Sequence, residues 1–337
     1  MASNLTSNSF PLSDALLYGQ SYSWKVVAYD GQGNQRSSST FNFSTRELFS
    51  TITDNAEFEG RLGHTSLVFN NKMWVIGGAL NGGNEVSDVW SSEDGQSWTE
   101  ATPSANFSNR SAHKSTVFDD KMWVIGGYSN NPNNDVWSSS DGANWTNVNN
   151  SAPFIARDNH SVISFNNKIW VIGGESSPLD LLDDVWNSDD GLTWTQVDTG
   201  GTLPPIARHT ALVFNNKIWL IAGLGENGWK NDVWNSSDGI TWNEVTSAAP
   251  FNVRYYHTSQ VYNDKLWVIG GISSGNVFQG DVWTSEDGIN WEQVIETPPF
   301  TPRDLLSSAV IDNKLFIIAG RDSSGRQNDV YAIFENP

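Results

Sequence analysis

The chain has 337 residues, a formal net charge of −19 at pH 7 and no cysteine. The negative charge argues against nucleic acid as a partner, because a phosphate backbone would be repelled. The lack of cysteine excludes disulfides, thiolate metal sites and a thiol nucleophile. No apolar stretch reaches the ~20 residues of a membrane span and no signal peptide is visible at Met1, so we expect no membrane insertion.

Residues 1–46 differ from the rest of the chain. Residues that alternate as in a half-buried strand are Tyr22, Trp24, Val26 and Ala28. The stretch 17–34 resembles strands F and G of a fibronectin type III domain, with Leu17, Gly19 and Tyr22 at its tyrosine corner. The first strands of such a domain are missing. We therefore interpret the chain as a piece of a longer multidomain protein, and expect residues 1–15 to be loosely held.

From residue 47 onward one unit is repeated six times. Its first copy reads HTSLVFNNKMWVIGG from His64 and, after a loop, SDVWSSEDGQSW up to Trp98. One position of the repeat recurs every 47 to 49 residues, at His64, His113, His160, His209, His257 and Leu306. A repeat of this length with four short strands is typical of a β-propeller blade.

Within the first copy we expect strands at residues 64–69, 73–77, 88–92 and 97–102. The pairs Asn-Asn and Asp-Gly between them suit tight hairpins, since both tolerate positive φ. The Met-Trp-Val-Ile run is apolar on both faces, as expected for a sheet packed between two others. The predicted fold class is all-β, a six-bladed β-propeller with four-stranded antiparallel blades.

The first and last copies are each incomplete. Phe49 lies 49 residues before Trp98, so residues 48–60 supply a fourth strand without the other three. The last copy supplies only the first three strands. We expect the N-terminal strand to complete the last blade as its outer strand, which closes the ring and removes open ends. The expected domains are a partial fibronectin type III-like segment at 1–46 and a monomeric propeller at 47–337.

The repeat also carries a family resemblance. Gly-Gly after an aromatic-bearing strand, then an aromatic residue in the third strand and a tryptophan in the fourth, resembles the Kelch repeat over residues 48–334. The hairpin Ser91–Trp98 is similar to the Asp-box of sialidases, although its aspartate lies four residues before the tryptophan instead of five. Galactose oxidase shares the Kelch repeat, but its Tyr–Cys cofactor needs a cysteine. We expect no cofactor.

All five histidines occupy the same place, at the start of the inner strand. Equivalent positions on six blades surround a channel instead of converging, whereas metal ligands lie about 2 Å from a shared ion. We therefore expect no metal site, and interpret these histidines as buried groups bonded to backbone or to a neighbouring blade.

An arginine stands three residues before the histidine position in five copies. In Kelch domains that bind acidic peptides, arginines at this loop position line the pocket, and the resemblance implies the same role here. The alternative is an ion pair with the aspartate that opens the third strand. The residues are Arg61, Arg110, Arg157, Arg254 and Arg303, and the fourth copy has Ile206 there and Arg208 two residues later.

Residues that break the repeat gather in the loops of one face, where function is usually found. They are Trp229, Tyr255, Tyr256, Phe278 and Tyr128. Three of these groups come from adjacent repeats, so we expect one aromatic patch that includes Arg254 and suits sugar stacking or a protein hot spot. The alternative is loop packing over the blade edge.

The leading hypothesis is a non-catalytic recognition module of an exported protein, extracellular, cell-surface or periplasmic, that binds a glycan or an acidic protein segment through this face. The second is a sugar-processing enzyme of the epimerase or lyase kind. N-acetylneuraminate epimerase is a six-bladed Kelch enzyme, and a site able to hold a sialic acid carboxylate and move a proton would use Arg254, Glu226, Glu175 and Tyr255. The third is a structural spacer that binds nothing.

Overall fold

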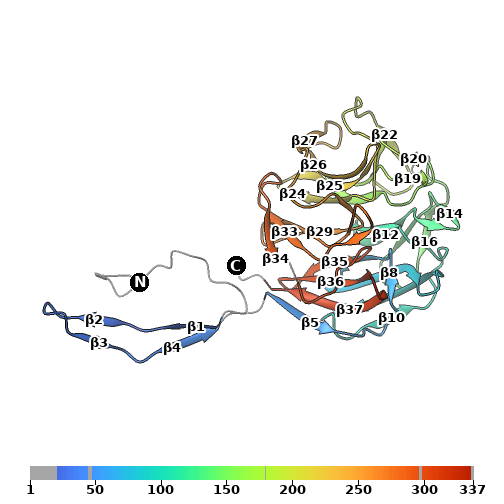
Figure 1. The fold of residues 1–337 in the computed structure, drawn as a ribbon. Coiled ribbons are helices and arrows are strands. Elements are labelled where there is room, and N and C mark those ends of the chain that lie inside the picture. Colours follow the sequence, from blue (N-terminus) through green and yellow to red (C-terminus); the bar gives the residue numbers. More distant parts are fainter. Residues whose placement is uncertain (1–20, 45–47, 179, 296–297, 335–337) are drawn as a thin grey trace. The chain divides into compact units, whose positions relative to one another are not determined.

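The computed structural model describes residues 21–44, 48–178, 180–295 and 298–334 (Figure 1). Every regular element in these ranges is a β-strand. The described residues include no apolar helix of membrane-spanning length. The chain divides into two compact units, Met1–Ser50 and Thr51–Pro337.

In the first unit, four short strands form two antiparallel pairs. They are β1 (Ser21–Trp24) with β4 (Phe41–Ser44), and β2 (Val27–Tyr29) with β3 (Gln35–Ser37). Trp24 stacks on Phe41 with ring centroids 4.7 Å apart, yet it remains 51% exposed. Two pairs of strands do not establish a fibronectin type III sandwich. The expectation for residues 1–15 lies outside the described ranges.

In the second unit, six antiparallel sheets follow the six repeats. The first holds β6 (Arg61–Leu62), β7 (Thr65–Phe69), β8 (Lys72–Leu80), β9 (Glu85–Ser92) and β10 (Thr99–Thr102). The second holds β11 (Lys114–Phe118), β12 (Lys121–Ile125), β15 (Val136–Ser139) and β16 (Thr146–Asn149). The third holds β17 (Ser161–Phe165), β18 (Lys168–Ile172), β21 (Val185–Ser188) and β22 (Thr195–Val197).

The fourth sheet holds β23 (Ile206–Ala207), β24 (Thr210–Phe214), β25 (Lys217–Gly225), β26 (Gly228–Ser236) and β27 (Asn243–Thr246). The fifth holds β29 (Thr258–Tyr262), β30 (Lys265–Ile269), β33 (Val282–Ser285) and β34 (Glu292–Ile295). The sixth holds β35 (Ser307–Ile311), β36 (Lys314–Asp322), β37 (Gly325–Ile333) and β5 (Phe49–Thr53), with β5 beside β37.

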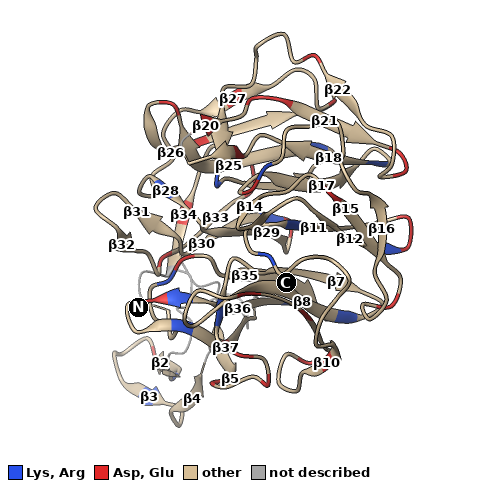
Figure 2. Cartoon of the chain, turned by 90° about the vertical axis from the view of Figure 1, so that its right-hand side faces the viewer, with Lys and Arg blue, Asp and Glu red and all other residues tan. Residues whose placement is uncertain are grey.

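Short additional strands pair at one end of the second, third and fifth sheets. They are β13 (Tyr128–Ser129) with β14 (Asn131–Pro132), β19 (Glu175–Ser177) with β20 (Asp180–Leu181), and β28 (Arg254–Tyr255) with β31 (Ile272–Ser273) and β32 (Val277–Phe278). Asp and Glu residues lie mostly in loops and at strand ends (Figure 2).

The inner strands of the six sheets contact one another in a cycle. The pairs in contact are β7 with β11, β11 with β17, β17 with β24, β24 with β29, β29 with β35, and β35 with β7. The order of contacts therefore returns to its starting strand.

A tryptophan–glycine contact repeats between consecutive sheets. A Cβ atom on Gly142, which has a φ of 77°, would lie 2.0 Å from Cζ3 of Trp74 in the preceding sheet. The glycine is therefore needed both for its backbone conformation and for the space beside the indole ring. The same contact joins Gly191 to Trp123, Gly239 to Trp170 and Gly288 to Trp219, while Phe316 of the last repeat lies against Gly95 of the first.

The hydrophobic core is divided among the spaces between sheets. One cluster joins Trp74 and Phe69 of the first repeat to Val124 and Trp145 of the second. Equivalent clusters join the second repeat to the third, the third to the fourth, the fourth to the fifth and the last to the first. Each sheet thus buries both faces, which explains strands that are apolar on both sides.

The Asp-Gly hairpins are stabilised by their own side chains. Asp94 Oδ1 accepts from the backbone N–H groups of Gln96 and Ser97, at 2.9 and 3.0 Å, and Ser92 Oγ accepts from Gly95. The bond from Ser97 lowers the pKa of Asp94 below its ordinary value, because it favours the ionised carboxylate. This arrangement recurs at Asp141, Asp190, Asp238 and Asp287.

Candidate binding site at a ring of backbone hydrogen bonds

Six residues, each immediately before the histidine position, form a closed ring of backbone hydrogen bonds. Each N–H donates to the carbonyl of the equivalent residue one repeat earlier, and the first donates to the last. The distances are 2.8 Å from Ala112 to Gly63, 3.1 Å from Asn159 to Ala112, 2.8 Å from Arg208 to Asn159, 3.4 Å from Tyr256 to Arg208, 2.8 Å from Leu305 to Tyr256 and 3.3 Å from Gly63 to Leu305. All six have positive φ, between 51° and 62°.

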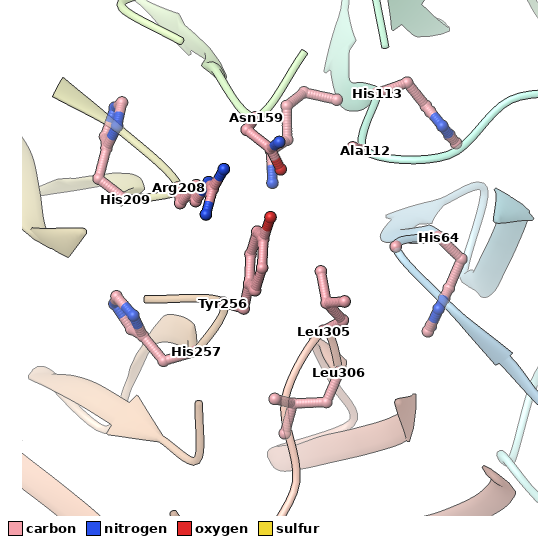
Figure 3. Close-up of a pocket in the computed structure, with 12 residues that line it drawn as sticks. His64, Ala112, His113, Asn159, Arg208, His209, Tyr256, His257, Leu305 and Leu306 are labelled. Atoms are coloured by element: carbon pink, nitrogen blue, oxygen red, sulfur yellow. The ribbon is translucent and has the colours of Figure 1, made fainter. Parts of the chain in front are cut away.

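The side chains on this backbone ring all differ. Gly63, Ala112 and Leu305 make one half small or apolar, and Asn159, Arg208 and Tyr256 make the other half polar. The three polar side chains point toward one another in the centre of the ring (Figure 3). A fixed frame therefore presents a variable, asymmetric set of side chains, the pattern expected of a recognition site.

Arg208 is fixed in place by a buried carboxylate of the preceding repeat. Its Nε and Nη2 donate to Oε1 and Oε2 of Glu175 at 2.9 and 3.1 Å, and the Glu175 residue is only 3% exposed. Asn159 Nδ2 donates to Glu175 Oε1 at 2.7 Å and to Asp158 Oδ1 at 2.6 Å. The bidentate geometry orients the guanidinium, and Nη1 takes no part in it.

Three aromatic rings continue this polar group. Trp229 and Tyr255 have ring centroids 4.2 Å apart, and Tyr255 meets Tyr256 edge to face at 4.6 Å. Arg208 Cζ lies 5.0 Å from the Tyr255 centroid and 5.3 Å from the Tyr256 centroid. We call these six residues the mouth cluster: Asn159, Glu175, Arg208, Trp229, Tyr255 and Tyr256.

Burial sets the charge states around the mouth cluster. It raises the pKa of Asp158 to about 6, with the nearby charge of Glu175 as a second cause. It also raises the pKa of Tyr256 above its ordinary value, so the phenol keeps its proton and can donate. Burial lowers the pKa of Lys114, at the start of β11, to about 8. Near neutral pH the site offers donors, acceptors and aromatic faces together.

The five predicted arginines lie elsewhere. Arg61 is fully buried, donates to both carboxylate oxygens of Asp88 at 2.8 Å, and donates to Gly77 O at 2.9 Å. Its Cζ lies 5.2 Å from the centre of the Phe58 ring. The equivalent ion pairs are Arg110–Asp135, Arg157–Asp184, Arg254–Asp281 and Arg303–Asp329. The structure places these guanidinium groups in ion pairs within the sheets instead of a cationic mouth, because each is no more than 1% exposed.

The fourth repeat breaks this pattern. Ile206 replaces the arginine, and Asp232, the partner it would have had, is 6% exposed with no hydrogen bond to Oδ1 from any described residue. Burial raises the pKa of Asp232 above its ordinary value. The arginine of this repeat is Arg208, which lies on the backbone ring.

Of the other predicted residues, Phe278 shares a three-stranded sheet with Tyr255, because both residues pair with Ile272 of β31. Phe278, on β32, is 5.6 Å from Arg321 Cζ, and Arg321 is paired with the buried Asp304. Tyr128 is 39% exposed on β13 of the second repeat, and the inner strand of that repeat is three steps from that of the fifth along the cycle of contacts. Glu226 is exposed between β25 and β26.

Sequence reasoning did not identify Asn159 and Asp158, and gave Glu175 only a catalytic role. A signal was available, since the residue before the histidine position is Gly, Ala, Asn, Arg, Tyr or Leu in successive copies while its surroundings are constant. Because the residue at this position varies while the rest of the repeat is constant, the fold of the repeat does not depend on its side chain. Such a position can therefore serve recognition.

Two cavities adjoin this site. A small one, of about 40 Å³, is lined by the ring residues, including Asn159, Arg208 and Tyr256. An axial cavity of about 210 Å³ adjoins it and is lined by the first residues of the inner strands, with Lys114, His209 and His257 shared between the two. Among the described residues, no group of three or more His, Asp or Glu side chains is placed to hold a metal ion.

Comparison with known families agrees with this architecture. Residues 139–287 match the KLHDC2/KLHL20/DRC7 Kelch-repeats domain, and residues 50–157 match the DUF6242 beta propeller domain. No curated protein matches the chain. The two matches overlap and together run from residue 50 to residue 287. The chain therefore contains a Kelch-type β-propeller.

Proposed function

We propose that this propeller is a non-catalytic interaction module that binds an extended protein segment through the mouth cluster. The observation that carries the proposal is the position of Arg208. Five repeats use this arginine in a buried ion pair, whereas the fourth leaves Asp232 without an ion pair among the described residues and has its guanidinium on the backbone ring. A repeat that gives up a stabilising pair to place a charge at an opening is explained by recognition.

The chemistry of the mouth cluster defines the segment. Trp229 and Tyr255 supply aromatic area, and aromatic residues beside arginine are the usual centres of binding energy in protein interfaces. Because Glu175 already balances Arg208, the site does not select strongly for acidic ligands. Polar side chains and peptide groups fit it better, since Asn159 and Tyr256 offer hydrogen bonds at the ring.

A glycan is the second candidate. Carboxylates and an amide next to aromatic rings suit sugar hydroxyls, and Asp158, Glu175 and Asn159 form such a group within hydrogen-bonding distance of one another. The enzyme hypothesis loses support, because Arg254 is buried against Asp281 and Glu226 is exposed in a turn. A nucleophile paired with a base is not evident among the described residues of the mouth cluster.

Peptide and glycan arrays test the proposal. We expect Trp229→Ala and Tyr256→Phe each to weaken binding about tenfold or more, while Lys121→Ala, on an exposed hairpin, leaves it unchanged. Binding only on the glycan array would select the second candidate. Equal binding by wild type and Trp229→Ala would overturn the proposed site. No binding on either array would overturn the proposed function and favour the structural spacer.

We also propose that the six sheets are the six blades of a closed propeller, completed by β5. The cycle of inner-strand contacts, the closed ring of hydrogen bonds and the bond from Ala56 N to Asn328 O at 3.0 Å support this closure. Deleting residues 1–47 should then leave a cooperatively unfolding protein, and deleting residues 1–60 should not. Equal stability of the two truncated chains would contradict the closure.

A further inference from the structure

The lining of the axial cavity contains one charged side chain. At the first position of the inner strand five repeats have a hydroxyl, at Thr65, Ser161, Thr210, Thr258 and Ser307, and the second repeat has Lys114. No Asp or Glu is among the described lining residues. Lys114 therefore brings a positive charge into a polar cavity without a carboxylate in its wall.

No ion pair offsets this charge among the described residues. Asp158 is the acidic group that acts on Lys114 electrostatically, but Asp158 and Lys114 do not form an ion pair. Asp158 Oδ1 instead accepts a hydrogen bond from Asn159. Lys114 is half-buried, and an ammonium that lines a cavity without a close carboxylate favours an anion beside it.

Two buried histidines near Lys114 lack partners. His64, His113 and His257 each have Nε2 within 3.2 Å of a serine or threonine hydroxyl of the preceding repeat in the cycle. His160 and His209 are 0% and 1% exposed, and neither of their ring nitrogens has a hydrogen-bond partner in the described part of the chain. His160 lacks one because Lys114 stands where the hydroxyl would be.

These groups are donors that lack acceptors. Burial lowers the pKa of His209 to about 3, so the ring is neutral and keeps one N–H. His209 lines the cavity, and so does Ser115, whose buried Oγ has no described partner. A cavity of about 210 Å³ has room for a small anion together with several waters, each of which occupies ~30 Å³ in the liquid.

We infer that the axial cavity is a binding site for a small inorganic oxyanion of the phosphate or sulfate class, with Lys114 as its charged partner and His209 and Ser115 as hydrogen-bond donors. Lys114 and His209 also line the small cavity at the backbone ring, so the two cavities adjoin. The site does not depend on the proposed ligand of the mouth cluster.

Titration calorimetry of the full chain with sulfate and with phosphate tests this inference. We expect Lys114→Thr to weaken binding of both anions about tenfold or more, since the variant removes the charged hydrogen-bond partner of the anion. Thr is the residue of the first, fourth and fifth repeats, so this variant should fold, and it also gives His160 a hydroxyl. Lys121→Thr, which is exposed, and Trp229→Ala should bind as wild type does.

A pH series with sulfate, whose charge is constant above pH 6, gives a second readout. The groups that face Lys114 are Asp158, with a pKa of about 6, and five histidines whose pKa burial lowers, so none of these titrates between pH 7 and 9; the histidines are His64, His113, His160, His209 and His257. Affinity should fall above pH 8 in wild type and stay flat in Lys114→Thr. Failure of both anions to bind wild type at millimolar concentration, or equal binding by Lys114→Thr, would overturn the site.

Discussion

Arg208 donates through Nε and Nη2 to the two carboxylate oxygens of Glu175, at 2.9 and 3.1 Å, and so joins the fourth repeat to the third. In each of the other five repeats, the arginine three residues before the histidine position binds an aspartate of its own repeat. This pair between repeats lies beside the backbone ring and holds the Arg208 guanidinium, which faces the centre of the ring (Figure 3).

The pair predicts a strong coupling between its two members. Arg208→Met should lower the free energy of unfolding by about 3 kcal/mol, because the Glu175 side chain is only 4% exposed and its buried charge would lose the guanidinium that balances it. Glu175→Gln should cost less, since the Arg208 side chain is 17% exposed and retains some hydration. The double variant should regain most of the loss. Urea unfolding of all four proteins measures the coupling, and simple additivity of the two losses would contradict it.

Neutralising the buried carboxylate of Asp232 should not lower the free energy of unfolding, in contrast to neutralising Glu175. Burial raises the pKa of Asp232 in the folded state, so the folded chain holds the proton more tightly than the unfolded chain. The free energy of unfolding therefore declines as pH rises through the pKa of Asp232. Asp232→Asn should remove this decline, and at pH 7 it should be as stable as wild type or more stable.

Asp184→Asn is the matched control for Asp232→Asn. It leaves Arg157, which is 0% exposed, without its partner, and should cost about 3–5 kcal/mol. Urea unfolding between pH 4 and pH 7 compares the two variants. A loss at Asp232→Asn as large as that at Asp184→Asn would mean that Asp232 has a stabilising partner.

The repeat makes most of the architecture predictable. Strands expected at 64–69 and 73–77 occur as β7 (Thr65–Phe69) and β8 (Lys72–Leu80), because apolar patterning and Asn-Asn turns specify them locally. The closeness of Trp229 and Tyr255 was also expected, since they come from consecutive repeats. The location of Asp158 and Asn159 was not, because a left-handed backbone at Asn159 and a contact across repeats place them, and neither leaves a local pattern.

The arginines show where pattern reasoning misled. A guanidinium three residues before the histidine position suits a ligand pocket and an internal ion pair equally well by residue type. Its recurrence in five copies favours the ion pair, since a contact required by every repeat recurs in every repeat. Arg208, the exception, is the one that reaches the ring.

The positive φ of the ring residues predicts an unusual response to glycine. Ala112 has a φ of 54°, a conformation that costs an L residue about 1–2 kcal/mol and glycine almost nothing. Ala112→Gly should therefore be neutral or stabilising by up to about 1 kcal/mol, after the greater freedom of glycine in the unfolded chain is subtracted.

Ala101→Gly, at the bulge between Glu100 and Thr102 of β10, where φ is not positive, is the control and should lose about 0.5–1 kcal/mol. The reverse change, Gly63→Ala, should be destabilising, because its Cβ would meet Ala112 N at 3.3 Å in addition to the φ of 62°. Thermal unfolding ranks the three variants. Equal losses at Ala112→Gly and Ala101→Gly would show that the ring imposes no strain.

The buried histidines predict that acid destabilises the fold. Leu306, which stands at the histidine position in the sixth repeat, suggests the substitution that tests this. Burial lowers the pKa of His209 from 6.5 to about 3, so between these values the unfolded chain binds a proton that the folded chain does not. The contribution to stability is complete above pH 6.5 and is lost as pH falls toward 3, by up to ~1.4 kcal/mol per pH unit.

His209→Leu copies Leu306 of the sixth repeat and removes no described hydrogen bond from the ring nitrogens. In buffers without phosphate or sulfate, its free energy of unfolding should match wild type at pH 7 and fall less steeply between pH 6 and pH 4. His64→Leu, which breaks the 2.7 Å contact with Ser307, should lose stability at pH 7 as well. Identical pH slopes in wild type and His209→Leu would mean that His209 is protonated in the folded chain, and that the cavity beside Lys114 already carries a compensating negative charge.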